Sequence, residues 1–349
     1  GGGNPLSLGR ELPVPRHYEP SAVGQVWQVA YQSRATEAAG FARAHGLSPS
    51  AEDRLRVALL VVDVQNTFCV PGFELFVAGR SGTAAVDDSR RLTEFVYRNL
   101  GRITRVFATL DTHQAAQIFH ALFLVDENGN HPPALTTVTT DDVTAGRWRF
   151  NERLAGALGV EAAQAGARLE RYVEELARGG RYALTIWPYH SMLGGIGHAL
   201  VASVEEALFF HAIARSSPTE FTVKGDNPFT EAYSVFGPEV SVDEHGRPVA
   251  RTDSRLLRQV LAFDRIIVAG QAKSHCVAWS VEDLLASAGR MGVPLAERLY
   301  LLEDCSSSVV VPGVVDYTDE ADAAFRRFAA AGAHLVHSDV PMEEWPGTW

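Results

Sequence analysis

Short runs of apolar residues alternate with longer segments of helical periodicity along most of the chain. Strands buried on both faces read as continuous apolar runs, whereas amphipathic helices repeat apolar positions every three to four residues. Strands that alternate with helices indicate a parallel, doubly wound sheet covered by helices on both faces. The runs that predict strands are 56–64 (RVALLVVDV), 103–111, 182–188, 219–225, 265–270, 298–304 and 333–338, and the segments with helical spacing are 87–102, 194–215, 274–292 and 319–332.

Segments at both ends and one in the middle depart from this alternation. Residues 1–54 are rich in proline and glycine at first and then helix-like, which predicts an N-terminal extension packed on a main domain spanning 55–340. Residues 121–186 form a predicted insertion, within which a loop-like stretch precedes an amphipathic segment that reads as one long helix or two. The tail, 341–349, carries two tryptophans and either packs on its own domain or covers an interface.

The composition narrows the classes of partner. The chain of 349 residues is 46% hydrophobic and carries a net charge of −11, which disfavours a nucleic-acid or anionic-membrane surface. Three scattered cysteines, Cys69, Cys276 and Cys305, do not form a disulfide framework and favour a reducing compartment. Neither a signal-peptide core nor an apolar run of membrane-spanning length is present. We therefore expect a cytoplasmic protein without nucleic-acid or membrane partners.

Polar residues stand just past several of the predicted strands, where doubly wound sheets bind their ligands. No glycine-rich dinucleotide motif follows the first strand and no Walker A motif is present, so nucleotide binding is unsupported. The polar residues at these positions are Asp63, Asp111, His113, His190, Lys224 and Cys276.

Cys276, Asp63 and Lys224 are candidates for nucleophilic catalysis. Cys276 lies in the first turn of a predicted helix, whose partial positive charge favours the nucleophilic thiolate. A carboxylate at Asp63 can accept the thiol proton, and an ammonium at Lys224 would favour both anions. Each residue also has an ordinary interpretation: a small buried hydrophobe, a loop cap and a solvated surface lysine, respectively.

A second group has the composition of a metal site. Asp111 and His113 are separated by one residue just past a strand, and His120 and His190 follow. One carboxylate with two or three imidazoles suits zinc, iron or manganese. Single histidines in a chain with twelve are, however, usually structural or solvated.

Taken together, these residues resemble the nicotinamidase branch of the isochorismatase-like cysteine hydrolases. The matching motifs occur in the family's order and span residues 56–304. They are VVDVQNTF (61–68), DTH (111–113), WPYH (187–190), VKG (223–225) with AYSVF (232–236), and VAGQAKSHCV (268–277).

The resemblance implies a three-layer α/β/α fold around a mostly parallel, doubly wound sheet, with the extension and the helical insertion added to it. It also implies that Asp63, Lys224 and Cys276 are a catalytic triad. The implied reaction is hydrolysis of an amide, nicotinamide first, to the acid and ammonia through a thioester on Cys276.

The resemblance further implies a catalytic-site metal and a pocket. Zinc is the first candidate, with iron or manganese as alternatives, and in nicotinamidases the metal holds the pyridine nitrogen of the substrate. A homo-oligomer is expected, also by resemblance. The implied metal ligands are Asp111, His113 and His190, with His120 as a further one. The implied aromatic walls of the pocket are Phe68 and Trp187, and further substrate-binding positions are Tyr233, Gln271 and Ala272. The Gln271–Ala272 bond corresponds to a cis peptide in the family.

Two departures from the family pattern leave the substrate open. Ser191 stands where members usually carry a cysteine after the WPxH histidine, and the 121–186 insertion lies between two implied metal ligands. The alternatives are a hydrolase of the same fold acting on another carboxamide, an N-carbamoyl compound or an isochorismate-like vinyl ether, a non-catalytic binding protein, and a redox-sensing thiol.

Overall fold

A central parallel sheet organises the protein in the computed structural model, which describes residues 11–248 and 254–349. Within these residues the sheet has six strands in the order β12-β9-β8-β1-β2-β7, and every pairing between neighbours is parallel. All six residues of β1 are buried, because strands flank it on both sides and helices cover both faces. The strands are β1 (Val57–Val62), β2 (Arg105–Asp111), β7 (Glu220–Lys224), β8 (Arg265–Gly270), β9 (Leu299–Leu302) and β12 (His334–Val336).

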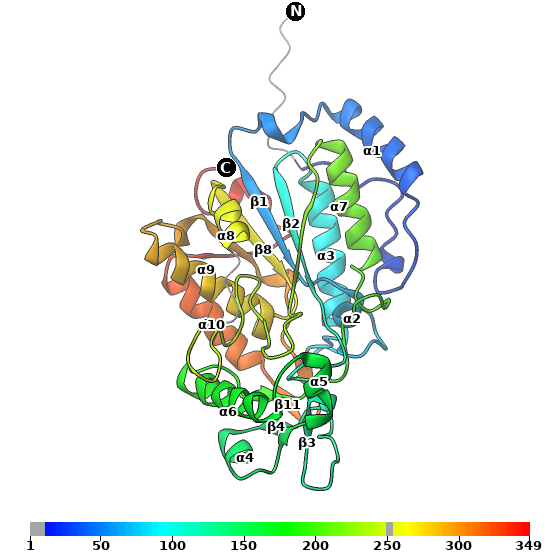
Figure 1. The fold of residues 1–349 in the computed structure, drawn as a ribbon. Helices are drawn as coiled ribbons and strands as arrows, with labels where there is room; N and C mark the ends of the chain where they lie inside the picture. The colour runs from blue at the N-terminus through cyan, green and yellow to red at the C-terminus, as the bar shows by residue number, and fades with distance from the viewer. Residues whose placement is uncertain (1–10, 249–253) are drawn as a thin grey trace, which may run out of the picture.

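Helices form an outer layer on each face of the sheet (Figure 1). On one face α3 (Ala84–Arg98) packs against α7 (Ala202–Ala214), and α1 (Tyr31–His45) lies on α7. On the other face α9 (Ala278–Arg290) packs against α10 (Thr318–Ala330). The predicted three-layer α/β/α architecture with a doubly wound parallel sheet is confirmed.

The chain winds away from β1 in two directions. From β1 it proceeds through β2 to β7, and it then returns through α8 (Ser254–Leu261) to β8 on the opposite side of β1, continuing to β9 and β12. The direction of winding therefore reverses between β1 and β8. Ligands of doubly wound sheets bind outside the carboxyl ends of the strands at such a switch point.

Two predicted elements differ from the structure. The run 182–188 was expected to be a strand of the main sheet, which is wrong: only β6 (Leu184–Thr185) forms, and it pairs antiparallel with β4 (Thr137–Val138) outside that sheet. The position beside β2 is taken by β7, so the apolar run has no place there. Helix α7 begins at Ala202 rather than 194, after a glycine-rich loop. Of the two alternatives for the segment 152–180, one long helix or two, the structure has two, separated at Gly159, which has a φ of 66°.

The predicted insertion, 121–186, folds into small elements below the carboxyl ends of the strands (Figure 1). Its longest helix, α6, is amphipathic and buries Leu169, Tyr172, Val173 and Leu176. The elements are β3 (Leu124–Val125), β4, α4 (Thr140–Thr144), β5 (Arg149–Phe150), α5 (Ala155–Leu158), α6 (Ala162–Arg178) and β6.

The two ends of the described chain pack on the main body. Residues 1–10 of the expected extension lie outside the described residues, but the remainder is held by Arg215, whose buried guanidinium bonds to Asp53 and to the carbonyl of Ser48. In the tail, the buried Trp345 stacks on the rings of Phe95 and Tyr300. The tail thus packs on its own domain. Along the described stretches, no helix has both the length and the apolar character needed to cross a bilayer.

Candidate active site

Lys224 contacts both other members of the expected catalytic triad, Asp63 and Cys276. Asp63 follows β1, Lys224 ends β7, and Cys276 lies in a π-helical turn, η5 (Lys273–Val277), between β8 and α9. The Lys224 ammonium lies 2.9 Å from Asp63 Oδ2 and 3.4 Å from Cys276 Sγ. It also donates to the carbonyl of Ala232 at 2.7 Å and to Asp111 Oδ1 at 3.1 Å. The interpretation of Lys224 as a solvated surface lysine is therefore wrong, because its side chain is buried among acceptors.

The carboxylate of Asp63 is held rigidly at the end of β1. The Thr109 hydroxyl donates to Asp63 Oδ1 at 2.6 Å, and the backbone N–H of Asp63 donates to the Thr109 carbonyl at 3.2 Å. Asp63 has a φ of 50°, a left-handed conformation that is rare outside glycine and frequent at functional sites. The main chain thereby turns back at Asp63 and aims its carboxylate at Lys224.

Burial is the largest influence on the pKa values of Cys276 and Asp63. It raises the pKa of the Cys276 thiol well above its usual value, and the charge of Lys224 offsets this only in part. The expectation of a thiolate from the helix terminus alone is therefore wrong for the resting protein. Burial also raises the pKa of Asp63 against the opposing effect of Lys224, so Asp63 is a stronger proton acceptor than an exposed carboxylate. The arrangement is a thiol of raised pKa and a buried base, both in contact with the Lys224 ammonium.

The turn before Cys276 has the shape expected for an oxyanion site. The Gln271–Ala272 peptide bond is cis, as expected from the resemblance. Gly270, which precedes it, has a φ of 125°, and a Cβ there would lie 2.1 Å from the Val62 carbonyl oxygen, so only glycine fits. Within the described parts of the chain, the Ala272 N–H donates to no protein acceptor, which leaves it available to a ligand.

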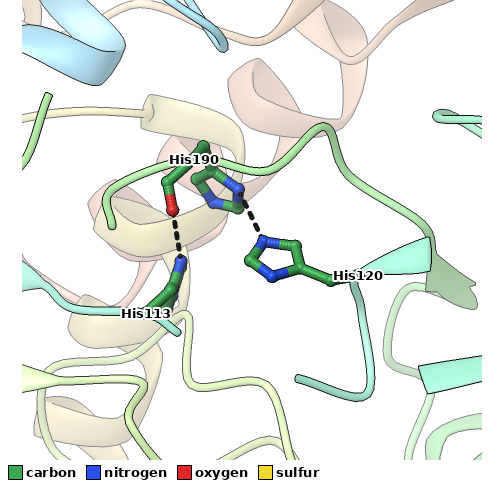
Figure 2. A group of neighbouring side chains, drawn as sticks. All are labelled: His113, His120 and His190. Atoms are coloured by element: carbon green, nitrogen blue, oxygen red, sulfur yellow. Dashed lines mark hydrogen bonds between the residues drawn. The ribbon is translucent and has the colours of Figure 1, made fainter. Parts of the chain in front are cut away.

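Four residues expected to be metal ligands converge beside the triad. His113 Nε2 lies 2.9 Å from Asp111 Oδ1, and His190 Nε2 lies 3.8 Å from Asp111 Oδ2. Ligand atoms of His113, His120 and His190 all lie within 4.8 Å of one another. Figure 2 shows the rings of His120 and His190 facing each other, with His113 beside the His190 carbonyl.

Each of the three imidazoles bonds to a backbone carbonyl through Nδ1. His113 Nδ1 lies 3.2 Å from the His190 carbonyl, His120 Nδ1 lies 2.9 Å from the Gln114 carbonyl, and His190 Nδ1 lies 2.7 Å from the Pro188 carbonyl. A carbonyl only accepts, so Nδ1 carries the proton in each ring and Nε2 keeps its lone pair; the Nδ1–H of His190 also lies 3.4 Å from His120 Nε2. This pattern is the usual one for histidines that bind a metal.

The donor set fits a divalent cation by three further observations. His113 Nε2 is buried and has no hydrogen-bond partner in the part of the chain that the structure describes. Burial lowers the pKa of His120 to about 4 and that of His190 well below its usual value, which keeps both rings neutral as metal binding requires. Burial raises the pKa of Asp111, but His113, Lys224 and His190 outweigh it and lower the pKa overall.

Gly225 gives the ligands the space they need. Its φ is 81°, and a Cβ at this position would lie 2.7 Å from Asp111 Oδ1 and 2.8 Å from His113 Nε2. Any larger residue would therefore fill the space between the two ligand atoms. This is a physical reason for the glycine in the VKG motif.

Glu231, which was not among the residues predicted from the sequence, faces the same group. Its carboxylate and the ligand atoms of Asp111 and His113 all lie within 4.8 Å of one another. Burial raises the pKa of Glu231 well above its usual value, and the nearby Asp111 adds to the effect. Its proximity to Tyr233 in the AYSVF motif was the available signal, but no regular element places Glu231, so periodicity did not reveal it.

A small, largely apolar pocket lies above the thiol; the space between its lining atoms, open solvent included, is about 390 Å³. Phe68, Trp187 and Tyr233, expected as pocket residues, all line it, as does Ala272, and the Trp187 indole donates to the Tyr233 hydroxyl at 3.1 Å. Gln271 does not line it; its side chain points instead to the α3 side. Further lining residues include Leu75, Val77, His275 and Val309.

The insertion packs behind this site on one side. The Tyr182 hydroxyl donates to the carbonyl of Ser274 at 2.8 Å, and its ring lies over His275, 4.5 Å between centroids. From α6, the hydroxyl of Tyr172 accepts the backbone N–H of Glu231 at 3.0 Å. The insertion therefore supports both the turn that carries Cys276 and the segment that carries Glu231.

Comparisons with known proteins agree with this architecture. No protein-family model and no curated protein matches the chain. Among solved structures, the yeast nicotinamidase bound to the inhibitor nicotinaldehyde matches with a TM-score of 0.50 and 16% identity, over 80% of this chain and 99% of that one. A nicotinamidase/pyrazinamidase of Acinetobacter baumanii matches with a TM-score of 0.49 and 18% identity, over 82% and 98% of the two chains. The pyrazinamidase of Pyrococcus horikoshii in complex with zinc has a TM-score of 0.43 and 18% identity, over 81% and 99%.

At these identities the likeness to the yeast structure establishes a shared fold. The chain therefore has the fold of the nicotinamidases, as its motifs indicated. Because fold does not imply function, the chemistry has to be argued from the site.

Proposed function

We propose that the chain is a metal-containing cysteine amidohydrolase that acts on a small aromatic carboxamide, with nicotinamide as the first candidate. The observation that carries the proposal is the buried Lys224, which bridges Asp63 and Cys276 beside an aromatic-lined cavity. A buried cation between a base and a thiol is costly unless it serves the site. The nicotinamidase fold of the chain supports the same reaction by analogy.

The first half of the reaction acylates the thiol. Asp63 accepts the proton of Cys276, and the sulfur attacks the amide carbonyl, forming the C–S bond as the carbonyl electrons move onto oxygen. Lys224 stabilises the thiolate and the carboxylate in turn. The backbone N–H groups of Ala272 and Cys276 donate to the oxyanion, which is typically the largest single contribution to such a barrier.

The second half releases the products. The tetrahedral intermediate collapses as Asp63 gives its proton to the amide nitrogen, and the C–N bond breaks to leave ammonia and a thioester. Asp63 then takes a proton from water, whose oxygen attacks the thioester. The C–S bond breaks, Cys276 regains a proton, and the acid departs, so that one amide and one water give one acid and one ammonia.

The metal-binding residues would orient the substrate. When bound, a divalent cation, with zinc as the first candidate, supplies a Lewis acid that can hold a heteroaromatic ring nitrogen. Asp111, His113 and His190 would hold it, with His120 as the fourth protein ligand and Glu231 beside them. Lys224 contacts Asp111 as well as the thiol, so one side chain spans the two parts of the site.

The size of the cavity favours a small planar substrate over a larger one. Trp187, Tyr233 and Phe68 surround a narrow space, and the insertion packs against its walls instead of widening it. We accordingly place N-carbamoyl compounds and isochorismate-like ethers behind simple carboxamides. We further propose a cytoplasmic homo-oligomer without nucleic-acid or membrane partners, on the acidic net charge of −11 and the resemblance.

Ammonia release from a panel of carboxamides, headed by nicotinamide, tests the proposal. The comparison uses wild type, Cys276→Ala and metal-stripped protein reloaded with zinc, iron or manganese. Release from nicotinamide that requires Cys276 and a metal supports the proposal. Release from nicotinamide that persists in Cys276→Ala, or turnover confined to bulky non-aromatic substrates, contradicts it.

A further inference from the structure

Asp88 is a buried carboxylate on α3 with no part in the reaction described above. Its side chain is 4% exposed, and a buried carboxylate is costly unless polar partners satisfy it. Its Oδ2 atom accepts from Gln271 Nε2 at 2.9 Å and from the Ser307 hydroxyl at 2.6 Å. The nearest cation, Arg91, lies 3.7 Å from the other oxygen on the same helix. The two strong donors to Asp88 thus come from outside its own helix.

Both donors belong to segments that hold the turn in front of the nucleophile. Gln271 and Ser307 bond to each other, since the Ser307 N–H donates to Gln271 Oε1 at 3.3 Å. The backbone N–H of Lys273 donates to the Ser307 carbonyl at 2.8 Å, and that of Gln271 donates to the Val62 carbonyl at 2.8 Å. Ala272, which lies between Gln271 and Lys273, is therefore fixed on both sides by contacts that meet at Ser307 and Asp88.

We propose that Asp88 is a positioning residue for amide hydrolysis: through Gln271 and Ser307 it orients the Ala272 N–H toward the oxyanion. The proposal rests on the proposed function, because the oxyanion arises only in that reaction. Asp88 connects α3 with the loops that follow β8 and β9, and β8 is one of the two strands at the switch point. It touches neither the cavity nor the triad, so its effect reaches the reacting atoms only through the turn.

The role requires an ionised carboxylate. An ionised Asp88 accepts both hydrogen bonds at one oxygen, whereas a protonated one needs an acceptor for its own proton. Burial raises the pKa of Asp88 to about 6, against the bonds from Ser307 and Gln271 and the charge of Arg91. The other titratable groups that face it are Asp304 and the buried thiols Cys69 and Cys305. Activity that depends on Asp88 is therefore present above about pH 6 and declines as the pH falls through it.

The test compares Asp88→Asn with Asp87→Asn. Asp87 is the adjacent residue on α3 and bonds to Thr83 and Arg90, away from the turn. The asparagine at 88 keeps the shape but removes the charge and one acceptor: with its amide oxygen at the Oδ2 position its NH2 faces Arg91, a donor against a donor, and in the reverse orientation its NH2 faces the Gln271 amide and the Ser307 hydroxyl. We expect Asp88→Asn to lower kcat about 10- to 100-fold with KM changed less than about twofold, because misplaced donors weaken transition-state binding selectively. Asp87→Asn should match wild type.

Two further readouts separate positioning from a structural role. The acid limb of kcat near pH 6 should disappear in Asp88→Asn, and backbone amides of the turn 271–277 should exchange hydrogen at least about tenfold faster, with other segments unchanged. Ser307→Ala, which removes one of the two donors, should give a smaller loss of kcat. If Asp88→Asn does not fold, the kcat and the turn exchange of Ser307→Ala still test the positioning role.

The outcomes distinguish the proposal from the function on which it rests. Wild-type kcat and turn exchange in both Asp88→Asn and Ser307→Ala would overturn the positioning role. A rise in KM with kcat unchanged would also overturn it, because that pattern indicates ground-state binding. If wild type hydrolyses no carboxamide, the proposed function fails. The hydrogen exchange of the turn 271–277 then still tests the contact: an unchanged rate in Asp88→Asn refutes the positioning of the turn by Asp88, and a faster rate supports it.

Discussion

Replacement of Lys224 by methionine removes a cation that contacts two buried carboxylates, Asp63 and Asp111. The ammonium lies 2.9 Å from Asp63 and 3.1 Å from Asp111, and all three side chains are at most 5% exposed. Removing one partner of a buried ion pair costs about 3–5 kcal/mol, because the remaining charge has no compensation. We expect the free energy of unfolding of Lys224→Met at pH 8 to fall by about that amount, and activity to be lost.

The stability loss should depend on pH with a definite sign. Burial already raises the pKa of Asp63, and without Lys224 the rise is larger because the opposing charge is gone. A carboxyl whose pKa is higher in the folded than in the unfolded state is protonated preferentially in the folded state. The variant therefore regains stability, relative to wild type, as the pH falls through that pKa. The deficit measured at pH 5 should be smaller than that at pH 8.

The chain contains a matched control for this experiment, because Lys273 is its only other lysine. Lys273 pairs with Asp322 at 2.7 Å, but the Asp322 side chain is 44% exposed. Lys273→Met should therefore cost at most about 1 kcal/mol. Urea unfolding followed by the fluorescence of the six tryptophans measures both variants. Equal losses for the two, or a deficit of Lys224→Met that grows at pH 5, would refute this account of the buried cation.

Three other properties can be predicted from single contacts. Gly225→Ala would place a Cβ 2.7–2.8 Å from two ligand atoms, so metal affinity should fall about 10- to 100-fold in a metal-content assay. Gly156→Ala is the control: a Cβ there meets nothing within 4 Å, and metal affinity should not change. Burial lowers the pKa of His211 to about 4, so its neutral form stabilises the fold above pH 6.5. Up to about 3 kcal/mol of this stability should be lost as the pH falls toward 4. His211→Gln should lose less stability than wild type over the same pH range in urea unfolding. Trp345→Ala removes a buried ring stacked between two others and should lower the free energy of unfolding by about 3–5 kcal/mol; a change below about 1 kcal/mol would mean that the tail contributes little.

The sheet could be predicted from the sequence because most of its strands are short apolar runs with helical segments between; the edge strand β7 alternates polar and apolar residues instead. Strand β8 has the predicted bounds, since its residues are apolar and end at the obligatory Gly270. The failure at 182–188 has a physical cause: an apolar run shows that a segment is buried, but not against what. Trp187 and Ile186 are buried in the cavity wall and the insertion rather than in the sheet.

The site could be predicted in part. Asp63, Asp111 and Lys224 follow or end main-sheet strands, so their convergence follows from the topology. The sequence placed His190 near them at the end of an expected main-sheet strand that does not form, and the residue arrives through a loop whose His190 carbonyl bonds to His113. The raised pKa of Cys276 could not be predicted, because a helix terminus is a local feature while burial depends on the whole fold. The contact from Asp88 to Gln271 joins residues 183 positions apart and has no sequence signature.

Trapping the acylated thiol tests the central claim most directly. The protein would be mixed with nicotinamide, quenched in acid within the first turnover and digested, and the peptides weighed by mass spectrometry. The account predicts a nicotinoyl group on the peptide that contains Cys276 and on neither of those with Cys69 and Cys305, with no adduct and no ammonia release in Cys276→Ala. An adduct on another residue, or undiminished ammonia release from Cys276→Ala, would contradict it.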